Sequence, residues 1–299
     1  MTKPAAQAVA SSTRSYTTPI QTRWEPRTAQ ELDAAIFGCL DNVGLLAGVA
    51  NTIMQLAHPG VGYGVIESRV TSGSLLHHPF KRTRTTLTYL AVALQGTTEE
   101  KLAYRKAISH AHAQVTSTET SPVQYRALDP ELQLWVAACL FWGYVDAREK
   151  FHGPMTPEQL AEFYEYAKPL GTTLQVRPDM WPKDIKAFWE YWDRQIDSMK
   201  MDDTVRGWLT QLMDLSFMGP FISIPMGNFA KLMTGGFLHP KIRAQMQIEW
   251  TPEQEKQFRK VTSAIGRVNR HLPRSLRQLP TTALLWDFRR RLKKGLPLN

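Results

Sequence analysis

Eight histidines are the residues of this chain best suited to bind a metal or to move a proton near neutral pH. The chain holds no HExxH sequence and no GxSxG sequence, which argues against a zinc protease and an α/β-hydrolase. His110 and His112 fall in one predicted helix and, being two positions apart, point to different sides. His112 shares its side with Ile108 and Val115 and is expected to be buried, whereas His110 is expected to face solvent.

A buried imidazole needs a hydrogen-bond partner or a metal ion, because an unpaired one costs about 1–3 kcal/mol. For His112 the residues alone favour a core histidine bonded to a carbonyl, and they leave the metal-ligand interpretation open. His58 is the second candidate for a metal ligand. Because it stands at the end of a predicted apolar helix, before Pro59, we expect it to bond the last free carbonyls of that helix.

A guanidinium and a hydroxyl are expected side by side in the segment after Pro79. Arg82 and Thr86 are four residues apart on a predicted helix, and Leu90 extends the same stripe. Such a pair suits a carboxylate or a bound oxygen species, although solvated arginines in a first helical turn would give the same pattern. Glu67 stands in an apolar, glycine-rich run. If buried, it needs a cation or keeps its proton, and Arg82 is its candidate partner.

Hydrophobic periodicity and helix-start signals predict an all-α fold. Thr28, Thr97, Thr156 and Thr251 each precede a Glu or Gln by three positions, which is the capping-box pattern. Alternating runs and the turn sequences typical of hairpins are scarce. The glycine-rich stretch 59–79 is expected to be a long link. The expected helices cover residues 29–38, 41–57, 80–95, 98–116, 129–150, 156–168, 183–198, 203–217, 222–234, 240–247, 251–271 and 281–294.

The composition predicts one large domain. With 299 residues, 43% of them hydrophobic and 21% charged, the chain can bury a large core and still enclose a ligand. Residues 1–27 are expected to be a disordered tail, and residues 28–299 a single domain. No secretory signal and no apolar stretch of about 18 residues is recognised. Because the chain has only two cysteines, a reducing, cytoplasmic setting is expected.

The net charge of +9 lies largely towards the C-terminus. Zinc-finger spacing, RNA-binding aromatic motifs and a P-loop are absent from the sequence, so no nucleic-acid partner is expected and a solvated basic face is the simpler interpretation. Segment 284–294 is basic and amphipathic, which leaves open a peripheral contact with a membrane surface. Aromatic and methionine residues between 181 and 250 have the spacing of a core, which is compatible with a pocket for a flat cofactor or a hydrocarbon. The oligomeric state stays open.

Several segments resemble the MpaB/rubber-oxygenase family, the latex-clearing proteins, formerly a domain of unknown function. The resemblance covers roughly residues 30–290, and it rests on the order and spacing of the segments together. They are Leu46-Ala-Gly-Val-Ala-Asn-Thr-Ile-Met-Gln55-Leu-Ala-His58-Pro59-Gly-Val61, Arg82–Thr86, His112-Ala-Gln-Val115, Tyr125-Arg-Ala-Leu-Asp129-Pro-Glu-Leu-Gln-Leu-Trp135, Pro240, Trp250-Thr-Pro252 and Leu272-Pro-Arg-Ser-Leu276-Arg277.

The resemblance implies an all-α fold with a globin-like core and additional helices, and a b-type haem whose iron is held by one proximal histidine. The segment His112-Ala-Gln-Val115 carries that role to His112. Glu67, Arg82 and Thr86 become catalytic pocket residues near the haem, with Arg82 and Thr86 also contacting the cofactor. The best-characterised members cleave isoprenoid double bonds with O2. The resemblance therefore implies a haem-dependent oxygenase that acts on a small apolar, isoprenoid-like or lipid substrate.

Two positions depart from the family pattern. Some rubber oxygenases present a lysine where Thr85 stands, so a lysine-capped resting iron is not expected here. A histidine commonly follows Trp135 by two residues, and Ala137 takes that place. Two alternatives therefore stay open: a non-enzymatic helical protein that binds lipid or a membrane surface, and a haem protein that acts as a sensor, peroxidase or carrier.

Overall fold

A computed structural model describes residues 38–70 and 76–298, and within these ranges the chain is all-α. No strand forms there; the only β-type pairing is an isolated antiparallel bridge between Thr116 and Arg126. The expected all-α domain is therefore confirmed. The expected N-terminal tail and the helix at 29–38 lie outside the described residues.

The helices follow one another along the chain. The elements are η1 (Gly38–Leu40), η2 (Asn42–Ala47), α2 (Gly48–Leu56), α3 (Pro59–Ile66), α4 (Pro79–Gln95), α5 (Thr98–His112), α6 (Pro130–His152), α7 (Pro157–Ala167), α8 (Pro169–Thr172), α9 (Ile185–Ser198), α10 (Asp203–Met213), η4 (Ser216–Met218), α11 (Pro220–Phe237), α12 (Pro240–Gln245), α13 (Pro252–His271), α14 (Arg274–Arg277) and α15 (Leu279–Lys293).

Side-chain caps fix where the long helices begin. Thr97, Thr156 and Thr251 each form the predicted capping box with the Glu or Gln three positions later, before α5, α7 and α13. Asp129 caps α6 by accepting a hydrogen bond from the backbone of Glu131. These caps satisfy backbone N–H groups that have no partner inside the helix, so each helix starts within two residues of its predicted position.

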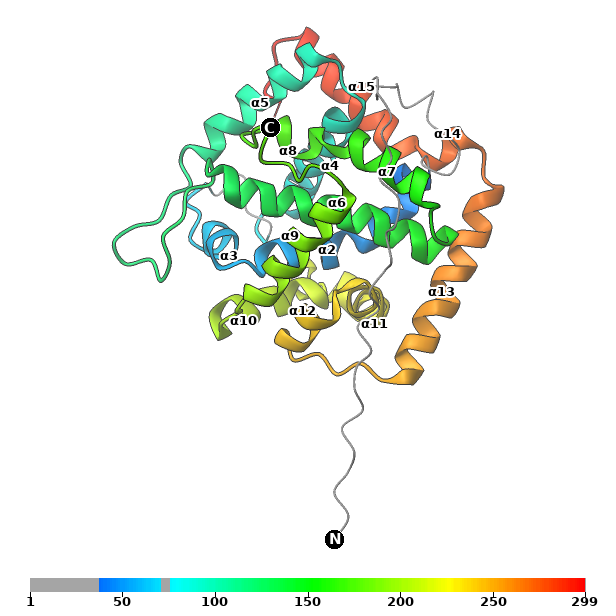
Figure 1. The fold of residues 1–299 in the computed structure, drawn as a ribbon. Helices are drawn as coiled ribbons and strands as arrows, with labels where there is room; N and C mark the ends of the chain where they lie inside the picture. Colours follow the sequence, from blue (N-terminus) through cyan, green and yellow to red (C-terminus); the bar gives the residue numbers. More distant parts are fainter. Residues whose placement is uncertain (1–37, 71–75, 299) are drawn as a thin grey trace.

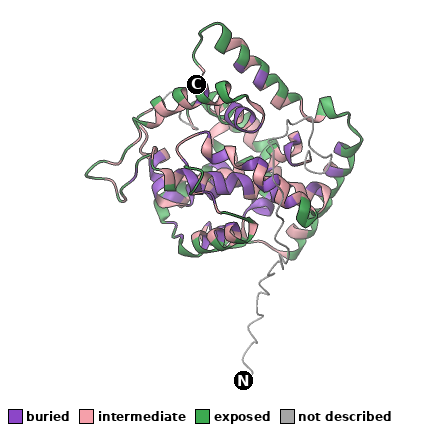
Figure 2. Ribbon diagram, turned by 45° about the horizontal axis from the view of Figure 1, so that its top comes forward, coloured by how far each residue is buried: buried purple, intermediate pink, exposed green. Residues whose placement is uncertain are grey.

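Helix α6 crosses the middle of the molecule and is its most buried long element (Figures 1 and 2). It packs against α2, α7, α8 and α13. Rings from α6 meet rings from α9: Phe141 lies edge-on to Phe188 with centroids 4.7 Å apart, and Trp135 stacks on Trp192 at 5.3 Å. The predicted core role of the aromatics after residue 181 is confirmed for α9. Phe221 of α11 departs from it, because 95% of its surface is exposed.

The stretch 59–79 was expected to be a link, and that expectation is wrong for its first part, which forms helix α3. Pro59 is pre-organised for the first helical position, and Nδ1 of His58 accepts the N–H of Gly60, so a helix starts directly after α2 ends. Glycine is required at 62, where a Cβ would lie 2.5 Å from the carbonyl oxygen of Leu56. The absence of a side chain at Gly62 thus lets α3 pack closely on α2.

Helix α5 ends at His112, four residues before the predicted end, and lies beside α4 and α15. The hydroxyl of Tyr104 in α5 donates a 2.7 Å hydrogen bond to the carbonyl of Thr85 in α4. The same ring packs edge-on against Phe288 of α15, with centroids 5.5 Å apart. These contacts hold the helix of His112 against the helix of Arg82.

Within 38–70 and 76–298 no helix combines the length and the apolar character needed to cross a bilayer.

Candidate active site

His112 is the last residue of α5, and its imidazole has no hydrogen-bond partner within the described part of the chain. Its Nδ1 atom is buried. Burial, followed by the positive charge of Arg82, lowers the pKa of His112 to about 4. The ring is therefore neutral at pH 7 and offers a lone pair. His110, on the other side of the same helix, is exposed as predicted, and the neighbours Ile108 and Val115 are partly buried.

Arg82 and Thr86 both lie on the solvent-accessible side of α4, one helical turn apart. Desolvation lowers the pKa of the Arg82 guanidinium. The influence of Arg82 on the pKa of His112 puts both groups within electrostatic reach of each other. The structure thus brings Arg82, Thr86 and the His112 ring to one region between α4 and α5.

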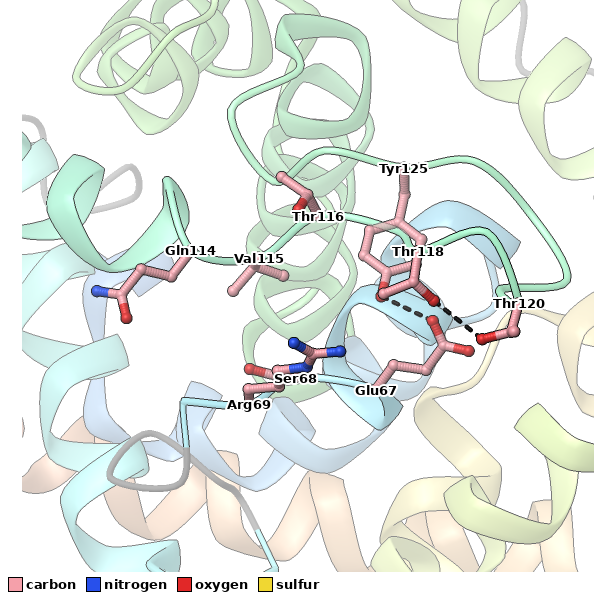
Figure 3. Close-up of a pocket in the computed structure, with 9 residues that line it drawn as sticks. All are labelled: Glu67, Ser68, Arg69, Gln114, Val115, Thr116, Thr118, Thr120 and Tyr125. Carbon is pink, nitrogen blue, oxygen red and sulfur yellow. Dashed lines mark hydrogen bonds between the residues drawn. The ribbon is translucent and has the colours of Figure 1, made fainter.

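Glu67 caps the C-terminal end of α3 and points towards the loop that follows α5 (Figure 3). Its Oε2 atom accepts hydrogen bonds from the hydroxyl of Ser121 at 2.6 Å and from that of Tyr125 at 2.8 Å. Burial, followed by the bond to Glu67, raises the pKa of Tyr125 to about 12. The phenol therefore stays protonated at neutral pH and donates to the carboxyl group.

The expected pairing of Glu67 with Arg82 is not found among the described residues. Two hydroxyl groups occupy Oε2 instead, and both come from the segment 117–128, which the sequence predicts only as a connection. Ser121 and Tyr125 are thus site residues that the sequence analysis missed. Tyr125 stands in a family segment, and a loop position beside a site was a signal that could have singled it out.

A pocket of about 270 Å³ opens beside Glu67 (Figure 3). Gln114 and Val115 reach it from the end of α5, directly after His112. Its volume lies just below the range of small-molecule sites. The lining residues are Glu67, Ser68, Arg69, Gln114, Val115, Thr116, Thr118, Thr120 and Tyr125.

Comparison with known proteins identifies the family. A model described as "ER-bound oxygenase mpaB/B'/Rubber oxygenase, catalytic domain" matches residues 39–267. The chain belongs to this oxygenase family. Two curated relatives, the uncharacterized proteins Rv2237 of Mycobacterium tuberculosis and Mb2261 of Mycobacterium bovis, are each 46% identical over 251 residues, which is 84% of this chain and 98% of theirs. No solved structure matches the chain, so the globin-like core stays a prediction.

The mpaB/rubber-oxygenase family implies a haem, and the free imidazole of His112 fits the single protein ligand that a haem iron needs. No group of three or more His, Cys, Asp or Glu residues in the described ranges could hold a bare metal ion. A haem, which brings four ligands of its own, does not require such a group. The residues present are therefore compatible with this cofactor.

His58 fits the ligand role less well than His112. It was expected to bond the carbonyls that end α2, but the structure corrects this, since its Nδ1 accepts the backbone N–H of Gly60 at the start of α3. A neutral imidazole whose Nδ1 is an acceptor carries its proton on Nε2. Burial lowers the pKa of His58, which favours that neutral form. Nε2 would have to lose its proton before it could bind iron.

The two positions that depart from the family pattern serve the packing of this chain. Ala137 is buried in α6, and a Cβ placed on Gly171 would come within 3.2 Å of its methyl group. Ala137 thus packs against Gly171 of α8. Thr85 turns its hydroxyl back to the carbonyl of Arg82 at 2.9 Å, so it closes the helical turn rather than reaching outward.

Proposed function

We propose that this chain is a haem b-dependent oxygenase that acts with O2 on a small apolar, isoprenoid-like or lipid substrate and cleaves it at a C=C bond. Membership of an oxygenase family supports the reaction class. The observation that carries the cofactor assignment is the unbonded, neutral imidazole of His112 beside the guanidinium of Arg82. A ring left without a partner is costly in a folded protein unless something outside the chain binds it.

His112 would hold the iron through a nitrogen of its neutral ring, because the lowered pKa leaves one of the two ring nitrogens without a proton down to mildly acidic pH. Haem, when bound, supplies the iron at which O2 reacts, a redox centre that no side chain provides. Arg82 keeps its charge at neutral pH and suits a carboxylate, such as a haem propionate, or a polar oxygen. Thr86, one turn further on α4, adds a hydroxyl to the same surface.

Glu67 is the proposed proton acceptor. Its Oε2 is engaged by Ser121 and Tyr125, which fix the carboxyl plane and leave Oε1 to take an allylic proton from the substrate. Tyr125 cannot compete for that proton, since its phenol remains protonated. Two residues of the loop after α5 would thus orient a carboxylate whose second oxygen takes the proton.

The cofactor is tested by absorption spectroscopy of the purified protein. The wild type is expected to show a Soret band that His112→Ala loses. His110→Ala, on the exposed side of the same helix, is the matched control and should keep it, as should His58→Ala. Full haem occupancy in His112→Ala would remove this residue from the site, and a colourless wild type would favour the non-enzymatic lipid binder.

The reaction is tested by O2 consumption with isoprenoid and unsaturated lipid substrates, with carbonyl products as the readout. Glu67→Gln is expected to keep the Soret band and to lower turnover by about 10²-fold or more, the usual scale for loss of a general base. A wild type that binds haem but consumes no O2 with any such substrate would instead indicate a sensor or carrier. Activity with peroxide in place of O2 would indicate a peroxidase.

A further inference from the structure

The positive charge of this protein is concentrated in one short segment. Residues 267–294 hold nine Arg and Lys and one acidic residue, Asp287. That segment therefore carries a net +8 of the chain's +9. The rest of the protein is close to neutral, so any long-range field arises from this region.

These residues form one continuous edge of the molecule. The end of α13, then α14 and then α15 follow one another along the upper right of Figure 1. We call the exposed residues of 267–294 the C-terminal edge. Large apolar side chains are exposed along it: Val268, Leu272, Leu276, Leu279, Trp286 and Leu292.

The buried side of α15 shows that this exposure is not the result of an undocked helix. Leu285 and Phe288 are buried against the neighbouring helices, and Phe288 packs on Tyr104. Trp286 lies between them in sequence and points away, with 66% of its surface exposed. The helix therefore presents two apolar surfaces, one in the core and one outward.

Several cations of the edge have no acidic partner within residues 38–70 and 76–298. Arg277, Arg289, Arg290 and Arg291 are paired with carboxylates of the protein. In contrast, no ion pair with a described residue is seen for the exposed side chains of Arg267, Arg270, Lys293 and Lys294. These four charges are available to an external anion.

We infer that the C-terminal edge docks the protein on a lipid bilayer that contains anionic headgroups. Free cations suit the phosphates of such a surface, and the exposed leucines and Trp286 suit the boundary between headgroups and acyl chains. A tryptophan with an apolar body and one polar N–H is favoured at that depth. A surface that binds nucleic acid uses cations for the phosphates and aromatic rings for stacking on the bases. The exposed aliphatic side chains of the edge have no role in such binding, so they favour a bilayer.

The edge adjoins the proposed active site through α4. Helix α15 packs along α4, and Arg84 of α4 forms an ion pair with Asp287 of α15 at 3.7 Å. Arg82 and Thr86 lie on the same helix α4. Docking at the C-terminal edge would therefore hold that helix near the bilayer, which dissolves apolar substrates. The docking itself does not depend on haem, so it is tested independently of the proposed activity.

The experiment is flotation of the full chain with vesicles, in about 0.1 M salt, where charges still act over a Debye length of about 10 Å. Vesicles of phosphatidylcholine alone are compared with vesicles in which about one third of the lipid is phosphatidylserine. The wild type is expected to float with the anionic vesicles and to remain behind with the neutral ones. Equal binding to both, or to neither, would overturn the inference.

Paired variants locate the surface. Lys293→Gln with Lys294→Gln should weaken binding by about 30-fold, since each such cation contributes on the order of 1 kcal/mol near an anionic membrane. Lys183→Gln with Lys200→Gln, two exposed lysines outside the edge, is the matched control and should change binding by less than about twofold. An equal loss in both pairs would mean that net charge alone, and not this edge, carries the binding.

Apolar variants test the insertion. Trp286→Ala should weaken binding even in high salt, where the charges are screened. Phe221→Ala is its control, because Phe221 is 95% exposed on α11 but lies in the segment 215–230, which has no charged residue. A larger effect of Phe221→Ala would move the docking surface to α11. Binding to duplex DNA that outcompetes the anionic vesicles would assign the edge to nucleic acid instead.

Discussion

The phenol of Tyr125 donates a hydrogen bond of 2.8 Å to Oε2 of Glu67, and so joins the loop after α5 to the end of α3. Fifty-eight positions separate the two residues. Ser121 bonds the same oxygen, so both hydroxyls of the loop act on one side of the carboxylate. The contact with Tyr125 provides a direct way to perturb the proposed base without touching it.

Replacing Tyr125 by Phe is expected to lower the free energy of unfolding by about 1 kcal/mol, the usual worth of one hydrogen bond. Ser121→Ala should cost a similar amount, and the double variant more than the sum, since Oε2 then loses both donors. Urea unfolding of the four proteins measures this cycle. Strict additivity would show that the two hydroxyls do not act on one carboxyl oxygen.

Acid should destabilise the haem-free protein in a window set by His112. Its folded pKa of about 4 lies below the ordinary value of 6.5, so the unfolded chain takes up a proton first as the pH falls. The stability contribution is complete above about pH 6.5 and is lost towards pH 4, with a slope of up to about 1.4 kcal/mol per pH unit. His112→Gln should flatten this slope in urea titrations. A part of the slope should remain in this variant, because the pKa of His239 is also lowered to about 4. Identical slopes in wild type and variant would contradict the burial of the imidazole.

Removing the charge of Arg82 should raise the pKa of His112. Arg82→Gln deletes the positive charge that disfavours the protonated ring, although burial, the larger cause, remains. The His112 pKa should therefore rise from about 4 without reaching the ordinary value of 6.5. NMR titration of the imidazole signals measures it, with Lys81→Gln, an exposed cation of the same helix turn, as control. An unchanged pKa in Arg82→Gln would place the guanidinium out of reach of the ring.

Close packing of α13 on α6 should make Gly266 irreplaceable. A Cβ there would lie 1.8 Å from the carbonyl oxygen of Phe151, a backbone atom that cannot move aside. Gly266→Ala is expected to cost about 3 kcal/mol through overpacking. Gly207→Ala in α10, where a Cβ would meet nothing within 4 Å, should instead stabilise by up to about 1 kcal/mol through helix propensity. Thermal unfolding compares the two, and a neutral Gly266→Ala would refute the close approach.

Removing Arg277 should destabilise the protein, because this arginine is paired with the buried carboxylate of Asp41. Oδ2 of Asp41 accepts a 2.7 Å hydrogen bond from Asn269 and lies 3.1 Å from Nη1 of Arg277. Arg277→Met leaves this fully buried carboxylate with Asn269 and the imidazole of His152, whose Nε2 lies 3.1 Å from the same oxygen, and is expected to cost about 3 kcal/mol. Arg289→Met breaks the more exposed pair with Glu100 and should cost less than about 1 kcal/mol. Similar losses of unfolding free energy in the two variants would show that burial does not make the Asp41–Arg277 pair the more important one.

Much of the fold follows from local sequence signals. Thr97, Thr156 and Thr251 cap helices where the capping boxes predict them, because that pattern satisfies backbone donors within four residues. The exposure of His110 also follows from helical spacing. The helix at Pro59 was missed, since glycines that disfavour an isolated helix are needed there for close packing on α2. That requirement is not visible within the segment itself.

For the site, the sequence by itself determined which groups are present and which helix carries each of them: the imidazole of His112 on α5, and Arg82 with Thr86 on α4. Only the tertiary structure decided their partners. Glu67 bonds Ser121 and Tyr125 rather than Arg82, and His58 caps a helix. Helical periodicity acts over a few residues, whereas a hydrogen bond between residues more than fifty positions apart depends on how every intervening element packs.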